Sequence, residues 1–157
     1  MQSQKLVDIL IEKNLKIATA ESCTGGLLAK NITDVSGSSS VFDMGIVSYA
    51  NRIKNEFLGV SNEVLSTVGA VSPETAEAMA RGIVKTADTD IGVGITGIAG
   101  PTGGTKDKPV GLVYYSIFIK REEKLILEKL LLTGDRDNIR NQTVETVINK
   151  LVEELGG

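Results

Sequence analysis

The 157-residue chain contains no histidine and a single cysteine, Cys23. Without histidine, neither a Ser-His-Asp triad nor a Cys-His pair can form, and zinc sites built on histidine are excluded as well. One cysteine cannot form an internal disulfide, which suits a protein of the reducing cytoplasm. If the chain carries out nucleophilic catalysis, its general base must therefore be a lysine, an aspartate, a glutamate or an amine.

Long apolar runs and an excess of basic residues are also missing. No stretch reaches the roughly 18 consecutive apolar residues of a membrane span, and the charges within 5–12 are unlike the core of a signal peptide. The net charge of −3 and the isoelectric point near 5.1 argue against nucleic acid or a membrane surface as partner. We therefore expect a cytoplasmic protein in which residues 1–157 form one domain.

Alternating segments predict the fold class. Helices are expected at about 3–14, 24–34, from a cap at Asn51 to before Gly59, after a cap at Ser61, at 73–87 after a cap at Ser72, and at 136–155. Strands are expected at about 16–21, 41–50 with a break or bulge near Gly45, 91–96, 110–120 and 124–132. This order predicts a single three-layer α/β/α domain with a mixed, mostly parallel sheet, whose late strand pair is antiparallel.

Ser22 is the favoured nucleophile. It lies in the sequence TAESCTGG (19–26), where an expected strand turns into an expected helix. The first N–H groups of a helix have no intrahelical partner and carry the positive end of its dipole, so they could hold an oxyanion. Cys23, Thr24 and Gly25 would supply these groups. A plain serine N-cap followed by flexible glycines is the alternative.

Cys23 is a rival nucleophile, because the same position would lower the pKa of a thiol. Only one of two adjacent side chains can point into a cleft. Since a free cysteine is more often a small buried packing residue, Ser22 is preferred.

Lys54 is the favoured general base. It falls in the first turn of the helix expected after Asn51, where the helix dipole and the neighbouring Arg52 would lower its pKa. Tyr49 precedes this helix and could hydrogen-bond the amine or relay a proton. The alternative is a solvated surface lysine with a half-buried tyrosine, because sequence spacing does not establish that Lys54 approaches Ser22.

Glycine-rich stretches raise the question of a nucleotide site. Residues 92–97 match G-x-G-x-x-G by letters, but the glycines lie within an expected strand and no helix follows, which disfavours a dinucleotide fold. No P-loop motif is present. The loop 97–104 follows a strand end, where open α/β sheets bind ligands, and its backbone N–H groups could bind an anion. Its glycines are Gly97, Gly100, Gly103 and Gly104. A flexible connection is the alternative.

Two arginines extend the apolar face of the last helix. Arg140 falls within the arc of Val144, Val147 and Leu151, and Arg136 lies at its edge. Both could face a cleft and bind a phosphate or a carboxylate. Alternatively, they extend to solvent or pair with nearby aspartates.

These motifs together resemble the CinA C-terminal domain family, named for competence and DNA damage, whose stand-alone members include nicotinamide-nucleotide amidases. The matching segments are TAESCTGG (19–26), GSSSVFDMGIVSYAN (37–51), GAVS (69–72), GIAGPTGG (97–104), KPVG (108–111) and GDR (134–136). The resemblance implies one α/β/α domain of the stand-alone form that converts nicotinamide mononucleotide and water to nicotinate mononucleotide and ammonia. It also implies Ser-Lys catalysis by Ser22, Tyr49 and Lys54, with no metal and no cofactor.

Two other functions stay open. The chain could be a non-catalytic binding or regulatory domain, or an amidase that acts on another small amide. The expected partner is a small nucleotide substrate, bound through the 97–104 loop or through Arg136 and Arg140. A homodimer formed through the late strand pair is the favoured assembly.

Overall fold

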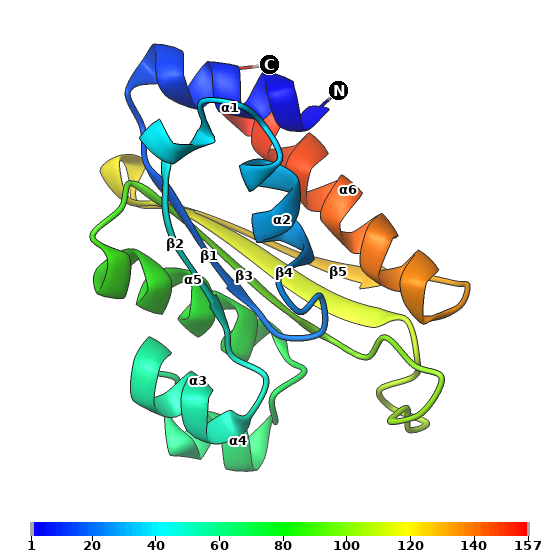
Figure 1. Ribbon diagram of the computed structural model, residues 1–157. Helices are drawn as coiled ribbons and strands as arrows, with labels where there is room; N and C mark the ends of the chain where they lie inside the picture. The colour runs from blue at the N-terminus through cyan, green and yellow to red at the C-terminus, as the bar shows by residue number, and fades with distance from the viewer. Residues whose placement is uncertain (1, 157) are drawn as a thin grey trace.

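A five-stranded mixed sheet forms the centre of the computed structural model, which describes residues 2–156 (Figure 1). The strands are β1 (Ile17–Glu21), β2 (Phe42–Val47), β3 (Ile91–Gly97), β4 (Leu112–Ile119) and β5 (Lys124–Leu131). Their order is β2-β1-β3-β4-β5. β1 pairs in parallel with β2 and β3, whereas β4 is antiparallel to both β3 and β5, so β4 alone runs against the other strands.

Helices cover both faces of the sheet. They are α1 (Gln2–Lys13), α2 (Leu27–Thr33), α3 (Asn51–Leu58), α4 (Asn62–Thr67), α5 (Pro73–Ala87) and α6 (Arg136–Glu154), with short 3-10 turns η1 (Ser38–Ser40) and η2 (Lys120–Glu122). α1, α2 and α6 lie on one face and α3, α4 and α5 on the other (Figure 1). The expected three-layer α/β/α fold is confirmed. Among residues 2–156, no helix combines the length and apolar composition that crossing a bilayer requires.

Two glycines within β3 explain how α5 packs on the sheet. A Cβ atom at Gly92 or at Gly94 would collide with backbone carbonyls of α5, those of Ala80 and Ala76 respectively. Glycine in a strand often marks such a close backbone approach. The G-x-G-x-x-G letters therefore serve helix packing, in agreement with the expectation that they are not a dinucleotide site.

Three local expectations were wrong. The helix expected at 24–34 begins only at Leu27, after the left-handed Gly26. Asn51 is the first residue of α3 and not its cap, because the extended Ala50 already accepts the first helical hydrogen bonds through its carbonyl. β2 ends at Val47, and its irregularity lies at Asp43: Phe42 pairs with Ile17 and Met44 with the next residue of β1.

The glycine at position 45 is therefore explained by close packing and not by a bulge. A Cβ atom at this position would lie 2.8 Å from Thr19 Oγ1 and 3.0 Å from the ring of Phe42. Glycine therefore allows β1 and β2 to pack closely along the segment that leads to Ser22.

β2 and β5 are the edge strands of the sheet. Apolar side chains are exposed on both: Met44 and Val47 on β2, Leu127 and Leu131 on β5. Apolar edge strands are features that favour self-association. The homodimer expected through the late strand pair stays a prediction.

Candidate active site

The candidate site lies where the carboxyl ends of β1 and β3 meet the loop after β2. In open α/β sheets this edge is where ligands bind. A cleft of about 340 Å³ opens here. Its lining residues are Ser22, Cys23, Tyr49, Lys54, Ala70, Val71, Thr96, Gly97, Ile98, Ala99, Gly100, Thr102, Gly103 and Arg136.

Ser22 directly follows β1, and the sheet fixes its backbone. Its N–H donates to the carbonyl of Ile95 on β3 at 3.0 Å, and the preceding carbonyl of Glu21 accepts from the N–H of Ser48 at 2.8 Å. The backbone of Ser22 is therefore held between two neighbouring chain segments.

Lys54 reaches Ser22 from α3. Its Nζ lies 3.1 Å from Ser22 Oγ, within the range for a nucleophile paired with its base. Two further acceptors contact the amine: the carbonyl oxygens of Ser48 at 2.7 Å and of Tyr49 at 3.2 Å. Side chains in the first turn of a helix point back toward its N-terminus, which directs Lys54 into the β2–α3 connection.

Burial controls the charge of Lys54. The residue is only 1% exposed and forms no ion pair with a carboxylate among residues 2–156. Removal from water disfavours the ammonium form and lowers the pKa of Lys54, partly offset by the nearby Cys23. The direction agrees with the sequence expectation, but the leading cause is burial. Arg52, expected to contribute, is exposed and paired with Glu56.

The three contacts of Lys54 are compatible with both forms of its amine. A neutral lysine has two N–H bonds and one lone pair, whereas the ammonium form has three N–H bonds and no acceptor. The ammonium form can donate to Ser22 Oγ and to the Ser48 and Tyr49 carbonyls, whereas the neutral form can donate to the two carbonyls and accept the hydroxyl proton of Ser22 with its lone pair. This geometry suits proton abstraction from Ser22.

Tyr49 contributes its backbone carbonyl to Lys54, but its hydroxyl lies elsewhere. The side chain is 60% exposed, and its hydroxyl accepts a hydrogen bond from Arg136 Nη2 at 3.0 Å. Arg136 Nη1 also donates to the carbonyl of Gly100 at 2.6 Å. Arg136 therefore spans the cleft from α6 to both the β2–α3 loop and the loop after β3.

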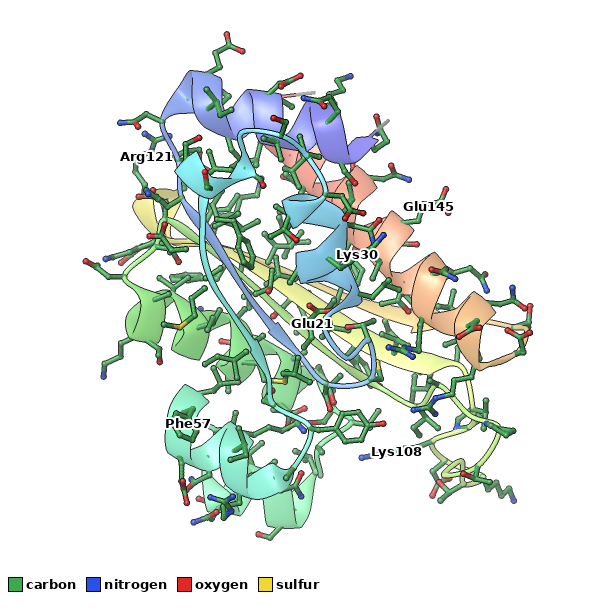
Figure 2. All side chains as sticks on the ribbon, viewed as in Figure 1. Glu21, Lys30, Phe57, Lys108, Arg121 and Glu145 are labelled. Carbon is green, nitrogen blue, oxygen red and sulfur yellow. The ribbon has the colours of Figure 1, made fainter. Side chains whose placement is uncertain are left out.

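The first-turn N–H groups of α2 are not free for an oxyanion. The carboxylate of Glu21 accepts from the N–H of Leu28 at 2.9 Å and of Ala29 at 3.1 Å, and from the hydroxyl of Thr24 at 2.6 Å. Figure 2 shows Glu21 between the end of β1 and the start of α2. A carboxylate at this place also complements the helix dipole. Glu21 thus caps α2.

Three N–H groups of the Ser22–Gly26 turn, those of Cys23, Thr24 and Gly26, remain for an oxyanion. Within residues 2–156, none of these three N–H groups has a hydrogen-bond acceptor. The N–H of Gly25 is taken by the carbonyl of Ser22 at 3.1 Å. The turn, and not the helix, therefore offers the donors.

Cys23 is poorly suited to act as the nucleophile. Its side chain is 6% exposed, and burial raises the pKa of the thiol to about 12. The thiolate is the reactive form of cysteine, so this thiol is inert near neutral pH. These properties of Cys23 favour Ser22 as the candidate nucleophile.

The glycine-rich loop divides into residues at the cleft and residues away from it. Gly97, Gly100 and Gly103 line the cleft, whereas Gly104 packs against Val110. Arg140 likewise does not line the cleft but donates to the carbonyl of Thr24 at 3.0 Å. Neither Arg136 nor Arg140 pairs with a carboxylate among the described residues.

Sequence reasoning missed two contributors. The carbonyl of Ser48 is the shortest contact of Lys54, and Thr96 lines the cleft with its hydroxyl on the carbonyl of Ala70 at 2.7 Å. Thr96 could have been found from its position at the carboxyl end of a central strand. The carbonyl of Ser48 leaves no such signal.

Across residues 2–156, no three Cys, Asp or Glu side chains are grouped as metal ligands would be.

Replacing Glu21 with glutamine should destabilise the fold without removing a cleft side chain. An amide has one oxygen and turns an NH₂ group toward donors, so buried N–H groups of α2 lose their acceptor. We expect a loss of about 1–3 kcal/mol in the free energy of unfolding, measured by urea denaturation. Glu145→Gln on the exposed face of α6 should stay within about 0.5 kcal/mol of the wild type. Equal stability of the two variants would show that Glu21 does not cap α2.

Comparison with known sequences relates this chain to a family. A family model described as the CinA C-terminal domain matches residues 1–155. A CinA-like protein of Kosmotoga olearia is 56% identical over 137 residues, which are 87% of this chain and 33% of that relative. A protein of Thermoanaerobacter pseudethanolicus named competence-damage inducible is 54% identical over 144 residues, 91% of this chain and 34% of that relative. The chain thus spans about a third of these relatives.

Solved structures share the fold over nearly their whole length. The crystal structure of the competence/damage inducible protein CihA from Agrobacterium tumefaciens has a TM-score of 0.92 at 39% identity, covering 100% of this chain and 97% of that chain. A CinA superfamily protein from Enterobacter cloacae has a TM-score of 0.94 at 33% identity, covering 99% and 90%. None of these names states an activity.

Proposed function

The chain belongs to the CinA C-terminal domain family, and from its cleft we propose an amide hydrolase with Ser22 as nucleophile and Lys54 as base. The observation that carries the proposal is the 3.1 Å contact between Ser22 Oγ and a buried lysine that has no carboxylate partner among residues 2–156. The proposed substrate is nicotinamide mononucleotide, which the resemblance to the family implies. The products are nicotinate mononucleotide and ammonia.

In the first half-reaction, neutral Lys54 takes the hydroxyl proton of Ser22 while Oγ bonds to the carboxamide carbon. The N–H groups of Cys23 and Thr24 would stabilise the resulting oxyanion, each good donor being worth about 3–4 kcal/mol. The Lys54 ammonium then protonates the amide nitrogen, the C–N bond breaks and ammonia leaves. An ester of Ser22 remains.

In the second half-reaction, water attacks the ester carbon and gives its proton to Lys54. The bond between carbon and Ser22 Oγ breaks, and Lys54 returns the proton to Oγ. Lys54 handles both transfers directly, because the hydroxyl of Tyr49 is engaged with Arg136 and no hydrogen bond joins it to the amine. Tyr49 acts in this scheme through its carbonyl and by orienting Arg136.

Charge supports an anionic substrate. The cleft is lined by Lys54 and Arg136 but by no aspartate or glutamate. A guanidinium binds phosphate with directed, charge-assisted hydrogen bonds. Arg136 is therefore the proposed phosphate ligand, with the N–H groups of Gly100 and Gly103 nearby. Because no carboxylate lines the cleft, none would attract the positively charged pyridinium ring and so compete with the placement of its carboxamide at Ser22.

Ammonia release by the purified protein tests the proposal. Turnover of nicotinamide mononucleotide, but not of nicotinamide or of its riboside, would support the amidase and its phosphate requirement. Turnover of other small amides alone would support the second enzymatic alternative. Nucleotide binding without turnover, detected by calorimetry, would instead support a non-catalytic domain.

Arg136→Met should weaken substrate binding more than chemistry. Loss of a charge-assisted hydrogen bond costs about 1.5–3 kcal/mol, so KM for nicotinamide mononucleotide should rise about 10- to 100-fold while kcat changes little. Steady-state kinetics measures both. Arg121→Met, at an exposed arginine of η2 outside the cleft, is the matched control (Figure 2). An unchanged KM in Arg136→Met would exclude Arg136 as the phosphate ligand.

A further inference from the structure

Arg140 reaches the turn of Ser22 from α6, which lies on the same face of the sheet as α2. It lies one helical turn after Arg136 on α6, yet it does not line the cleft. Its Nη2 donates to the carbonyl of Thr24 at 3.0 Å, 116 positions earlier in the chain. This is the contact that links the last helix to the turn of Ser22.

The turn itself is tied at Thr24. The Thr24 hydroxyl is held by Glu21, and its carbonyl accepts from both Arg140 and the N–H of Leu27 at 3.0 Å. The next N–H along the chain, that of Gly25, returns to the carbonyl of Ser22. The peptide group between Thr24 and Gly25 is therefore fixed at both ends, and the guanidinium supplies the charged contact.

Gly25 leaves the space that this contact needs. Its φ is +59°, and a Cβ atom there would lie 2.9 Å from Arg140 Nη2. Any side chain at this position would meet the guanidinium, whereas glycine adopts the left-handed conformation without strain. The close approach of Arg140 and the shape of the turn thus depend on each other.

Stability alone does not account for this placement. Nε of Arg140 is buried without a hydrogen-bond partner among the described residues, and no carboxylate pairs with the guanidinium. A buried donor without an acceptor costs about 1–3 kcal/mol. A methionine or leucine would fill the site without this cost, so the guanidinium is better explained by the turn that it holds.

We propose that Arg140 is a positioning residue, which fixes the Ser22–Gly26 turn so that Ser22 Oγ meets Lys54 and the free N–H groups of the turn face the oxyanion. It does not bind substrate phosphate. This assignment rests on the proposed Ser-Lys chemistry. It separates the two arginines of α6, which the sequence could not do: Arg136 acts on binding and Arg140 on the geometry of the nucleophile.

Kinetics distinguishes positioning from phosphate binding. Arg140→Met should lower kcat for nicotinamide mononucleotide about 100-fold, the cost typical of a misplaced reacting group, with KM within about three-fold of the wild type. Arg140→Lys keeps the positive charge but has a less directed donor, so its kcat should lie between those of the wild type and Arg140→Met. Guanidinium ion at millimolar concentration should restore part of the kcat of Arg140→Ala, an effect that a purely structural role would not produce. A rise in KM at unchanged kcat would overturn the assignment.

A substrate-independent probe separates this inference from the proposed function. A small alkyl fluorophosphonate should react with Ser22: a bond forms between Oγ and phosphorus, fluoride leaves and the proton passes to Lys54. Intact mass spectrometry follows the rate. Arg140→Met should react at least about ten-fold more slowly than the wild type, and Arg81→Met, at an arginine of α5 that stacks on Phe118, should react at the wild-type rate.

The outcomes are distinct. Equal labelling of the wild type and Arg140→Met would overturn the positioning role and leave the Ser-Lys proposal intact. No labelling and no ammonia release by the wild type would overturn both. Thermal unfolding of each variant checks that it is folded, and should Arg140→Met not fold, Arg140→Lys and the guanidinium rescue of Arg140→Ala carry the same test.

Discussion

Ser22→Ala will release no measurable ammonia from nicotinamide mononucleotide, while it will still bind the nucleotide. Without Oγ no ester can form, and loss of a nucleophile that acts as a unit with its base costs about 10⁴-fold or more in kcat. The binding residues proposed for the phosphate, above all Arg136, lie on other elements and keep their contacts. Ammonia release and calorimetric titration of the same preparation measure the two properties.

Two matched variants control for this result. Ser36→Ala removes an exposed serine outside the cleft and should leave kcat unchanged. Cys23→Ala removes the adjacent thiol, whose pKa burial raises to about 12, and should retain most of the activity. An active Ser22→Ala together with an inactive Cys23→Ala would identify the thiol as the nucleophile and contradict the mechanism proposed above.

Lys54→Met and Lys54→Arg will both lose almost all turnover, and they will do so for different reasons. Methionine fills the buried space but accepts no proton. Arginine keeps a positive charge and donors but is never deprotonated in proteins. Because serine and base act together, each variant should lose about as much as Ser22→Ala, with ammonia release as the measurement. Lys85→Met, on the exposed face of α5, should retain full activity.

The pH profile of the wild type tests the same lysine. The reaction needs Lys54 without its proton, so kcat/KM should rise with pH through the pKa of Lys54 and then level off. Burial lowers this pKa from its ordinary value of 10.5, so the plateau should be reached at a pH below that of an exposed lysine. A rate that falls as pH rises over this range would contradict a lysine base, as would full activity in either substituted variant.

The local order of the chain followed from sequence because it depends on short-range patterns. The α5 helix has its serine cap, its proline at the first position and a regular apolar stripe, and it lies at 73–87 as expected. The hydroxyl of Ser61 likewise caps α4. Where the expectation was wrong, at Asn51 and at the start of α2, the backbone conformation was decisive: the extended Ala50 is the cap in one case, and Gly25 and Gly26 have positive φ in the other.

The sequence predicted the candidate site only in part. The lack of histidine and the sequence around Ser22 narrowed the chemistry to a serine with a lysine, and the direction of the pKa shift of Lys54 was foreseen. The cause was not, because burial depends on how α3 packs beneath the sheet edge and the exposed Arg52 contributes little. Helical periodicity placed Arg140 within the apolar face of the last helix and Arg136 at the edge of that face, but it could not tell which of them meets the cleft.

By itself, the sequence determined the alternation of helices and strands, the positions of most caps and the set of groups available for chemistry, since each of these depends on residues close together in the chain. Tertiary structure decided which of those groups meet. Ser22 and Lys54 are 32 positions apart, and Thr24 and Arg140 are 116 apart. Their contacts exist because β2 and β3 flank β1 and α6 packs beside α2 on one face of the sheet, an arrangement set by the burial of apolar faces and not by any local motif.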